Sequence, residues 1–588
     1  MTASAIDAGS LSDRSLFHLL RSCQMGEAGA IVGGHIDRNE LRKELYVPTI
    51  EDQAVQDFFV DDYREDGSLL VITGSAGDGK SALLSRAFKR AMDADKPVDE
   101  SHIRMDATAA DTKHETYDVA LNRFLRKRAR NAERQRGPRS GLAINLGLAI
   151  DFFDRQGYAD QYPGLWEAID AVRTKREYKT ENVHAINLGH RRLYETRPDE
   201  LGEGLLREIV EKFAFDSPAS PFHEAFEREK DQCPAGEKCP LHYNASQFTK
   251  ETVRERVAKL LATSGVVNTT YLNPRSILDH VTSMILPRSL QELAVEGACP
   301  VGAGIRGNPV PPESLLWNTI FERLDDPSDP GAGQLDPAAS SSVSLDQILL
   351  SWGAAPDRVS TLLGETPLGS RVETATRIRT ALRRLYLVDE QRIEAPIETA
   401  LESPQFDEFL GALTYLNQEP STVEDDTELQ QYVTDVLRTV QASLQGWSGS
   451  ITDDDYIEFV DGIKSTDYRF LSKWSKPDPD RAASHRQTQQ ETTPGQLWLV
   501  LKPEGTDVTV PVPVTFELYQ LMTRIRDGYN PNALDLERSE GMRLIQSRLS
   551  EFTNKQEQVR VVNKLDTELF RVEEGGFDTI EIKSGEQL

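Results

Sequence analysis

The stretch GSAGDGKS, residues 74–81, has the spacing of a phosphate-binding loop, G-x-x-x-x-G-K-S. Its glycines let the backbone curl, so that several N–H groups point inward at phosphate oxygens. We expect the Lys80 ammonium to bind the β- and γ-phosphates of ATP and the Ser81 hydroxyl to bind Mg²⁺. The expected nucleotide-binding residues are Gly74, Ser75, Ala76, Gly77, Asp78, Gly79, Lys80 and Ser81.

The segments on either side of this loop have the pattern that the loop requires. The run LVIT, residues 70–73, precedes it and is typical of a buried strand. The run SALLSRAFKRAM, residues 81–92, follows it with apolar residues at helical spacing. The order strand, loop and helix favours a phosphate site, with the positive end of the helix facing the phosphates, over a chance match.

Hydrolysis also needs a polar group beside the phosphates, and later apolar runs end in candidates. These runs cover residues 102–108, 141–147 and 182–189, and the last two share the phrase AINLG. In AAA-like ATPases the third core strand ends in an acid and the fourth in a polar sensor. This order assigns Asn145 to the place of the acid and Asn187 to the γ-phosphate sensor, although an amide cannot accept a proton from water.

Asp106, within the second run, is the nearest alternative acid, and Asp151 is a weaker one. Two simpler explanations stay open: AINLG marks two buried strands that end alike, and Asp106 caps a turn or a helix. The catalytic candidates are Lys80, Asp106, Asn145 and Asn187.

Two arginines are candidates for a sensor that contacts the γ-phosphate. Arg191 comes soon after the fourth run, and Arg275 stands at the head of a helix in LNPRSILDHV. For Arg191 the alternative is a solvated helix start.

The segment DQCPAGEKCPLHYN holds Cys233, Cys239 and His242 in the spacing C-x5-C-x2-H. Thiolate and imidazole ligands suit a structural Zn²⁺, with Cys299 or His223 as the fourth ligand. The first interval is longer than in ordinary zinc fingers, so buried free thiols in a small loop are the alternative.

Residues 123–139, RFLRKRARNAERQRGPR, carry eight cations and one acid. In an acidic chain this local excess is the best indication of nucleic-acid contact. A basic helix face that is merely solvated, or paired with acids elsewhere, is the alternative.

The composition indicates a chain adapted to salt. The 588 residues carry a net charge of −28, with 20 lysines against 47 arginines. Carboxylates hold hydration and molar salt screens their repulsion, so we expect a halophilic protein. Only four cysteines, no secretory signal and no long apolar run predict a cytoplasmic chain with no membrane partner.

The order of runs predicts an α/β P-loop NTPase core of AAA-like type with a helical lid, a helical middle region and an α+β C-terminal domain. Polar stretches at 325–345 and 474–496 are the expected linkers. The expected domains are residues 1–48 (N-terminal helices), 49–215 (NTPase core), 216–310 (lid with the Cys/His cluster), 311–473 (mainly helical) and 497–588 (α+β).

Several of these stretches together resemble one family, the DNA phosphorothioation-dependent restriction protein DptF. They are LYVPTIEDQAVQDFF, VITGSAGDGKSALL, MDATAADTKHETYD, AINLG and CPLHYN, between residues 40 and 290. The resemblance implies a component of a system that attacks DNA lacking sulfur in its backbone. It also implies DNA and other Dpt subunits as partners, among them a helicase-like one, with ATP driving or gating DNA engagement.

The sequence therefore predicts an ATP-binding, ATP-hydrolysing component of DNA restriction and phage defence, slow when alone because the third run lacks an acid. No nuclease motif is evident, so cleavage would belong to a partner. Two alternatives stay open: a nucleotide-gated scaffold without turnover, and a small-molecule kinase. Also open are whether DNA contact is direct or through partners, and whether the chain forms a homo-oligomer.

Overall fold

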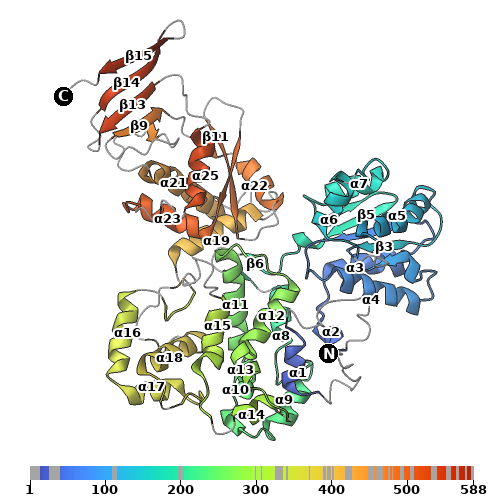
Figure 1. The fold of residues 1–588 in the computed structure, drawn as a ribbon. Helices are drawn as coiled ribbons and strands as arrows, with labels where there is room; N and C mark the ends of the chain where they lie inside the picture. Colours follow the sequence, from blue (N-terminus) through green and yellow to red (C-terminus); the bar gives the residue numbers. More distant parts are fainter. Residues whose placement is uncertain are drawn as a thin grey trace. The chain divides into compact units, whose positions relative to one another are not determined.

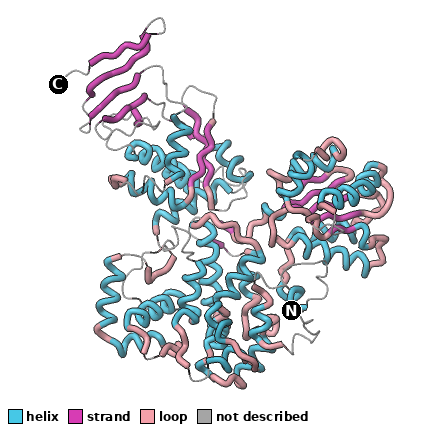
Figure 2. The backbone as a smooth tube through the Cα atoms, in the orientation of Figure 1, coloured by secondary structure: helices cyan, strands magenta, loops and turns pink. Residues whose placement is uncertain are grey.

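The computed structural model describes residues 14–584 apart from a set of gaps. The gaps are residues 25–39, 109–114, 156, 197–200, 203, 298, 306–307, 325–334, 340–341, 370, 389–392, 394–398, 400–402, 418–426, 448–455, 459–467, 474–476, 480, 491–494, 504–508, 532–534, 536–538, 551–557, 564–567 and 576–578. The chain divides into two compact units. Figure 1 shows its helices and strands coloured along the sequence, and Figure 2 shows the backbone coloured by secondary structure. Unit 1 is Met1–Glu195, Gly202–Thr263 and Leu272–Thr399, and unit 2 is Thr196–Leu201, Ser264–Tyr271 and Ala400–Leu588.

A five-stranded sheet in the order β2-β3-β1-β5-β4 forms the centre of the N-terminal part of unit 1 (Figure 1). The strands β1 (Leu69–Thr73), β2 (Ile103–Arg104), β3 (Ser140–Ala143) and β5 (Val183–Asn187) are parallel to their neighbours. They coincide with the four apolar runs, so the prediction of an α/β domain with a parallel sheet is confirmed. The short strand β4 (Glu177–Lys179) is antiparallel to β5 and was not predicted, because its residues are mostly charged.

Helices cover both faces of this sheet (Figure 1). Since successive strand residues point to opposite faces, Leu70 and Ile72 of β1 pack on one side and Leu69 and Val71 on the other. The first face is covered by α3 (Ile50–Gln56) and α4 (Lys80–Asp93), and the second by α5 (Tyr117–Glu133), α6 (Leu146–Ile150) and α7 (Pro163–Ala171).

The rest of unit 1 is mainly helical. Two short N-terminal helices, α1 (Leu16–Arg21) and α2 (Glu40–Leu45), belong to this unit as well. The helices after the sheet are α8 (Leu205–Glu211), α9 (His223–Lys230), α10 (Pro240–Gln247), α11 (Glu251–Val267), α12 (Pro274–Ile285), α13 (Arg288–Leu293), α14 (Pro300–Ile305), α15 (Leu316–Leu324), α16 (Val343–Gly353), α17 (Pro356–Leu363) and α18 (Thr374–Val388). The last three pack around the buried Trp352. Most of the expected linker 325–345 lies outside the described residues.

Unit 2 combines helices with two small antiparallel sheets, in the orders β10-β11-β12 and β15-β14-β13-β9-β8. Its helices are α19 (Pro404–Asn417), α21 (Thr427–Trp447), α22 (Arg481–Gln490), α23 (Phe516–Arg526) and α25 (Glu540–Ser550). Its strands are β8 (Tyr456–Glu458), β9 (Tyr468–Lys473), β10 (Pro477–Pro479), β11 (Leu497–Pro503), β12 (Val510–Val514), β13 (Gln558–Asn563), β14 (Glu568–Gly575) and β15 (Thr579–Ser584).

The expected polar linker 474–496 contains α22, which corrects that prediction. The helix has no apolar stripe, but it buries the polar residues Ser484, His485 and Thr488. The Ser484 hydroxyl accepts a hydrogen bond of 2.8 Å from the Val500 N–H of β11. Polar residues that pack on a strand in this way give no periodic apolar signal.

Among the helices that the structure describes, none has the length and hydropathy needed to cross a membrane.

The packing of β3 against α4 leads to a stability prediction. A Cβ on Gly141 would lie 2.7 Å from Leu84 Cδ1 and 3.1 Å from Phe59 Cζ. We expect Gly141→Ala to lower the free energy of unfolding by about 1–3 kcal/mol, because the added methyl overpacks the core. Gly164→Ala in α7 is the control, since a Cβ there meets nothing within 4 Å and alanine favours a helix. Denaturant unfolding in molar salt measures both, and a Gly141→Ala variant as stable as the control would contradict the packing.

Candidate functional site

The loop of residues 74–81 joins β1 to α4 at the carboxyl edge of the sheet. α4 packs on one face, whereas α6, which follows the neighbouring strand β3, packs on the other. Where the connections of adjacent parallel strands separate in this way, a crevice opens at the strand ends, and ligands bind there. Gly77 and Gly79 have φ of 96° and 92°, so the loop needs glycine at both positions to curl.

Lys80 and Ser81 stand at the start of α4, where the phosphate-binding pattern requires them. The Lys80 ammonium donates hydrogen bonds to the carbonyls of Ser75, at 2.7 Å, and Gly74, at 3.3 Å. Burial lowers the pKa of Lys80, and the carboxylates of Asp78 and Asp106 oppose this change. A cation is therefore held over the curled loop with two carboxylates acting on it.

The segment after β2 brings Asp106 to the loop. The Ser81 hydroxyl donates a hydrogen bond of 2.7 Å to the Met105 carbonyl. The next residue, Asp106, is exposed, and its carboxylate accepts hydrogen bonds from the N–H and hydroxyl of Thr108, at 2.8 and 2.6 Å. Asp106 thus caps a turn, as the simpler explanation held, and it also acts on Lys80. Both features fit an acid beside a phosphate site.

The buried side chain of Asp78 forms a hydrogen bond within the loop. It is 2% exposed, and its Oδ2 accepts a hydrogen bond of 2.5 Å from the Ser75 N–H. A Cβ on Gly74 would lie 2.5 Å from the same oxygen, so the tight approach of this carboxylate requires glycine there. The buried Asp78 carboxylate therefore stabilises the curled backbone of the loop. The sequence pattern did not predict this structural role.

Asn145 and Asn187 each cap the turn that leaves their strand. The Oδ1 of Asn145 accepts a hydrogen bond of 3.0 Å from the Gly147 N–H, and the Oδ1 of Asn187 accepts one of 2.9 Å from the Gly189 N–H. This shared turn explains why AINLG occurs twice. Asn145 lies beside the loop, since the Leu146 N–H donates to the Gly74 carbonyl at 3.3 Å.

The two asparagines differ in burial. Asn187 is 1% exposed, and its Nδ2 also donates to the Val172 carbonyl at 2.8 Å. Both ends of this amide are therefore bonded to backbone, and its role as a γ-phosphate sensor stays a prediction. The other candidate acid, Asp151, accepts a hydrogen bond of 2.7 Å from the Tyr117 hydroxyl.

Arg191 lies against the loop and is held by an acid that sequence reasoning missed. Its Nη1 donates to the Asp78 carbonyl at 3.4 Å, and its Nε lies 3.3 Å from Glu51 Oε2. Glu51, on α3, is 3% exposed and also pairs with Arg176. Burial would raise the pKa of Glu51, but Arg191, Arg176 and Thr49 outweigh it and hold that pKa below its usual value. No motif in the sequence joins Glu51 to Arg191.

The start of α12 also reaches the loop. The Asn273 side chain caps this helix by accepting a hydrogen bond of 2.9 Å from the Ser276 N–H. Its Nδ2 donates to the Ala76 carbonyl at 3.3 Å. Arg275 follows two residues later, and its charge, after burial, lowers the pKa of Arg42. The sequence predicted a helix head here, but only the fold places it at the loop.

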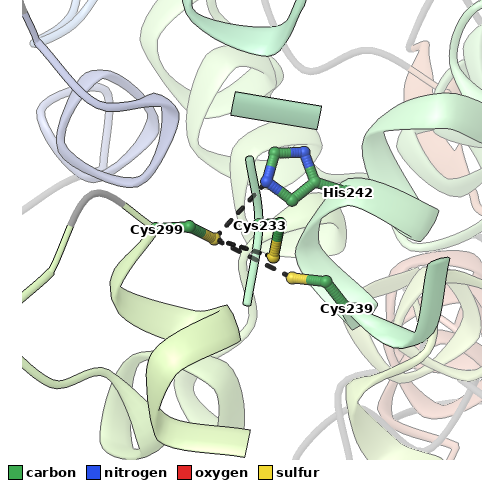
Figure 3. A group of neighbouring side chains, drawn as sticks. All are labelled: Cys233, Cys239, His242 and Cys299. Carbon is green, nitrogen blue, oxygen red and sulfur yellow. Dashed lines mark hydrogen bonds between the residues drawn. The ribbon is translucent and has the colours of Figure 1, made fainter. Parts of the chain in front are cut away.

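The predicted Cys/His cluster forms in the helical part of unit 1 (Figure 3). Cys239 is the N-cap of α10, and His242 follows three residues later on the same side of its first turn. Cys233 comes after α9, and Cys299 directly precedes α14. The fourth member is therefore Cys299; the alternative, His223, instead bonds the Phe215 carbonyl through Nδ1 at 2.8 Å.

Figure 3 shows the four side chains pointing toward one another, and their ligand atoms all lie within 4.8 Å of one another. Cys299 Sγ lies 3.5 Å from Cys233 Sγ, 4.0 Å from Cys239 Sγ and 3.4 Å from His242 Nε2. Zinc–sulfur bonds of about 2.3 Å in a tetrahedral site separate two sulfurs by about 3.8 Å. All four residues are buried, and the buried Cys₃His cluster can bind a structural metal such as zinc.

The surroundings of the cluster fit thiolate ligands. The Gly302 N–H points at Cys299 Sγ at 3.4 Å, and a Cβ on Gly302 would collide with Cys233 Sγ. Hydrogen bonds from Cys239 and Cys299 lower the pKa of the Cys233 thiol, whereas the hydrogen bonds to Cys233 raise the pKa of Cys239 and that of Cys299. Among the three thiols, Cys233 is therefore the one held as a thiolate. His242 Nδ1 and Glu229 Oε2 are buried without a hydrogen bond among the described residues. Burial raises the pKa of Glu229, and the charge of His242 opposes this rise.

Comparison of this chain with protein-family models, with curated proteins and with solved structures gives no match.

Metal binding by the Cys₃His cluster can be tested directly. We expect the purified chain to hold one zinc per molecule, and Cys239→Ser to lose it. The variant should also unfold several kcal/mol more easily, because metal binding adds to the folding free energy. Metal analysis and thermal unfolding in molar salt measure the two effects. Cys23→Ser, a cysteine outside the cluster, is the control; equal zinc content in both variants would contradict the site.

Proposed function

We propose that this chain is an ATP-binding P-loop NTPase that hydrolyses ATP slowly by itself and serves in phosphorothioation-dependent DNA restriction. The observation that carries the nucleotide part is that Asp106, after β2, lies near Lys80 and Ser81 of a curled loop at the carboxyl ends of parallel strands. The resemblance in residues 40–290 carries the restriction part. The AAA-like subdivision and the helical lid stay predictions.

The loop supplies the groups that bind a nucleoside triphosphate. Lys80 and the N-terminus of α4 offer positive charge to the phosphates. The Ser81 hydroxyl donates its hydrogen to the Met105 carbonyl, which leaves an oxygen lone pair free to hold Mg²⁺. When bound, Mg²⁺ would neutralise charge on the β- and γ-phosphates. Arg191 and Asn273 close the loop from two other elements.

Asp106 takes the place of the acid that β3 lacks. Asn145 lies two residues after the end of β3, at the N-cap of α6, and it can orient a water but cannot remove its proton. Asp106 is exposed, acts on Lys80 and follows the residue that fixes Ser81. We propose that its carboxylate would help to hold Mg²⁺ and that Asn145 would position the attacking water. This division makes the isolated site slow.

A nucleotide-gated scaffold is the second candidate. It is favoured because Asn145 and Asn187, after β3 and β5, are amides rather than acids. Their side-chain oxygens also accept hydrogen bonds from backbone N–H groups. Nucleotide retained intact after purification would support this reading.

Two substitutions separate binding from positioning. Lys80→Ala should lower ATP affinity at least about tenfold, or about 1.4 kcal/mol, because the phosphates lose their cation. Asn145→Ala should leave the affinity within about twofold, because this side chain caps a turn beside the loop. Titration with a fluorescent ATP analogue in molar salt gives both dissociation constants. Equal losses in the two variants would overturn the assignment of Asn145.

The restriction role has its own measurement. We expect unmodified duplex DNA to raise the rate of phosphate release from ATP several-fold, and phosphorothioate-modified DNA of the same sequence to leave it unchanged. Lys80→Ala is the control for contaminating ATPases. Equal effects of the two DNAs would show that discrimination does not lie in this chain, and no turnover with ATP still bound would favour the scaffold.

A further inference from the structure

The basic stretch at residues 123–139 divides into buried and exposed cations. Arg128 is buried, donates to the Ser101 carbonyl, and lies 5.0 Å from the centre of the Phe124 ring. Arg139 is also buried, and it pairs with Asp66 at 2.8 Å. These two arginines hold the fold together, so they are not available to a partner.

The exposed cations form a stripe along the outer side of α5. Arg126, Lys127, Arg130 and Arg134 are exposed, whereas the opposite side of the helix buries the apolar residues Ala120, Leu121, Leu125 and Ala132. Positions 126, 130 and 134 are four residues apart, so their side chains follow one another along the helix. We call these four residues the α5 stripe. Within the part of the chain that the structure describes, none of these side chains makes an ion pair or hydrogen bond.

This absence of partners is informative in a chain with 95 acidic residues against 67 lysines and arginines. Some other exposed arginines pair with acids: Arg173 pairs with Asp170 at 2.9 Å and Arg288 with Glu292 at 3.0 Å. On α5 itself, Arg123 pairs with Glu115 at 2.7 Å. Because the net negative charge repels nucleic acid at long range, DNA can be held only where cations are concentrated and free of internal acids.

We propose that the α5 stripe binds the sugar–phosphate backbone of duplex DNA, an inference that rests on the proposed function in DNA restriction. From Arg126 to Arg134 the helix rises about 12 Å, which matches three to four base-pair steps of about 3.4 Å each. Three of the four cations are arginines, whose planar guanidinium groups bind phosphate through paired hydrogen bonds. Contacts of this kind position a duplex without reading its sequence.

The place of α5 in the chain links this surface to the nucleotide site. The helix lies between β2, whose exit carries Asp106, and β3, whose exit carries Asn145. At the start of α5, the Tyr117 hydroxyl bonds Asp151 at 2.7 Å, in the turn that follows α6. DNA on the stripe therefore contacts the segment that connects the two polar ends beside the phosphate loop.

The test compares two variants that lose the same charge. One carries Arg126→Gln, Lys127→Gln, Arg130→Gln and Arg134→Gln. The control carries Lys43→Gln, Arg288→Gln, Arg371→Gln and Arg379→Gln, four exposed cations elsewhere in unit 1. Binding of a labelled duplex of mixed sequence is measured by fluorescence anisotropy across a series of KCl concentrations. A fluorescent ATP analogue and thermal unfolding report the nucleotide site and the fold of each protein.

We expect the stripe variant to lose at least about tenfold in DNA affinity, and its slope of log K against log salt to fall by about 3 to 4 in magnitude. The control variant should keep the affinity and slope of the wild-type chain. Wild-type DNA binding that the stripe variant retains, an equal loss in the control, or displacement of DNA by polyglutamate as readily as by unlabelled duplex would each overturn the proposal.

The same measurements distinguish failure of the proposed nucleotide site from failure of the α5 stripe. A wild-type chain that binds no ATP analogue would overturn the proposed nucleotide site, whatever the stripe does. A chain that binds the analogue normally but binds no duplex at any salt concentration would overturn the α5 stripe alone.

Discussion

The hydrogen bond from the Ser81 hydroxyl to the Met105 carbonyl is the interaction on which the candidate nucleotide site depends. β2 is separated from β1 by β3, and this bond ties the segment after β2 directly to the start of α4. This hydrogen bond brings the Ser81 hydroxyl, the proposed Mg²⁺ ligand, close to the residue that precedes Asp106. The same bond orients the serine, because the hydroxyl hydrogen is committed and the lone pairs face away from the carbonyl.

The sheet explains why the polar groups meet although their sequence positions are far apart. Parallel strands bring all their carboxyl ends to one edge, and the order β2-β3-β1-β5 places the exits of β3 and β5 on either side of the loop. Glu51 and Asn273 then approach from α3 and α12, which lie before and well after the sheet in the chain. The loop is thereby held by elements that span more than 200 residues of sequence.

The features that depend on a local sequence pattern could be predicted from the sequence. The phosphate loop, the four apolar runs and the Cys-x5-Cys-x2-His segment were found because glycine spacing, apolar runs and ligand spacing are written in adjacent residues. Sequence reasoning could not choose between Cys299 and His223, or see Glu51 against Arg191, because these contacts are set by helix packing. AINLG drew attention to Asn145 and Asn187 as catalytic candidates, whereas the structure shows a shared turn in which each oxygen accepts from a glycine N–H. The helix α22 was missed because it buries polar residues, which leave no apolar period.

We propose that Asp106, and not Asn145 after the end of β3, completes the metal and phosphate site. The most direct test measures Mn²⁺ binding by electron paramagnetic resonance in the presence of a non-hydrolysable ATP analogue. It compares the wild-type chain with the variants Asp106→Asn and Asn145→Ala. We expect Asp106→Asn to weaken Mn²⁺ binding about tenfold, or about 1.4 kcal/mol. Asn145→Ala should leave Mn²⁺ binding unchanged, and binding of the analogue in EDTA should be the same in all three proteins. Unaltered Mn²⁺ affinity in Asp106→Asn, or a loss confined to Asn145→Ala, would contradict this proposal.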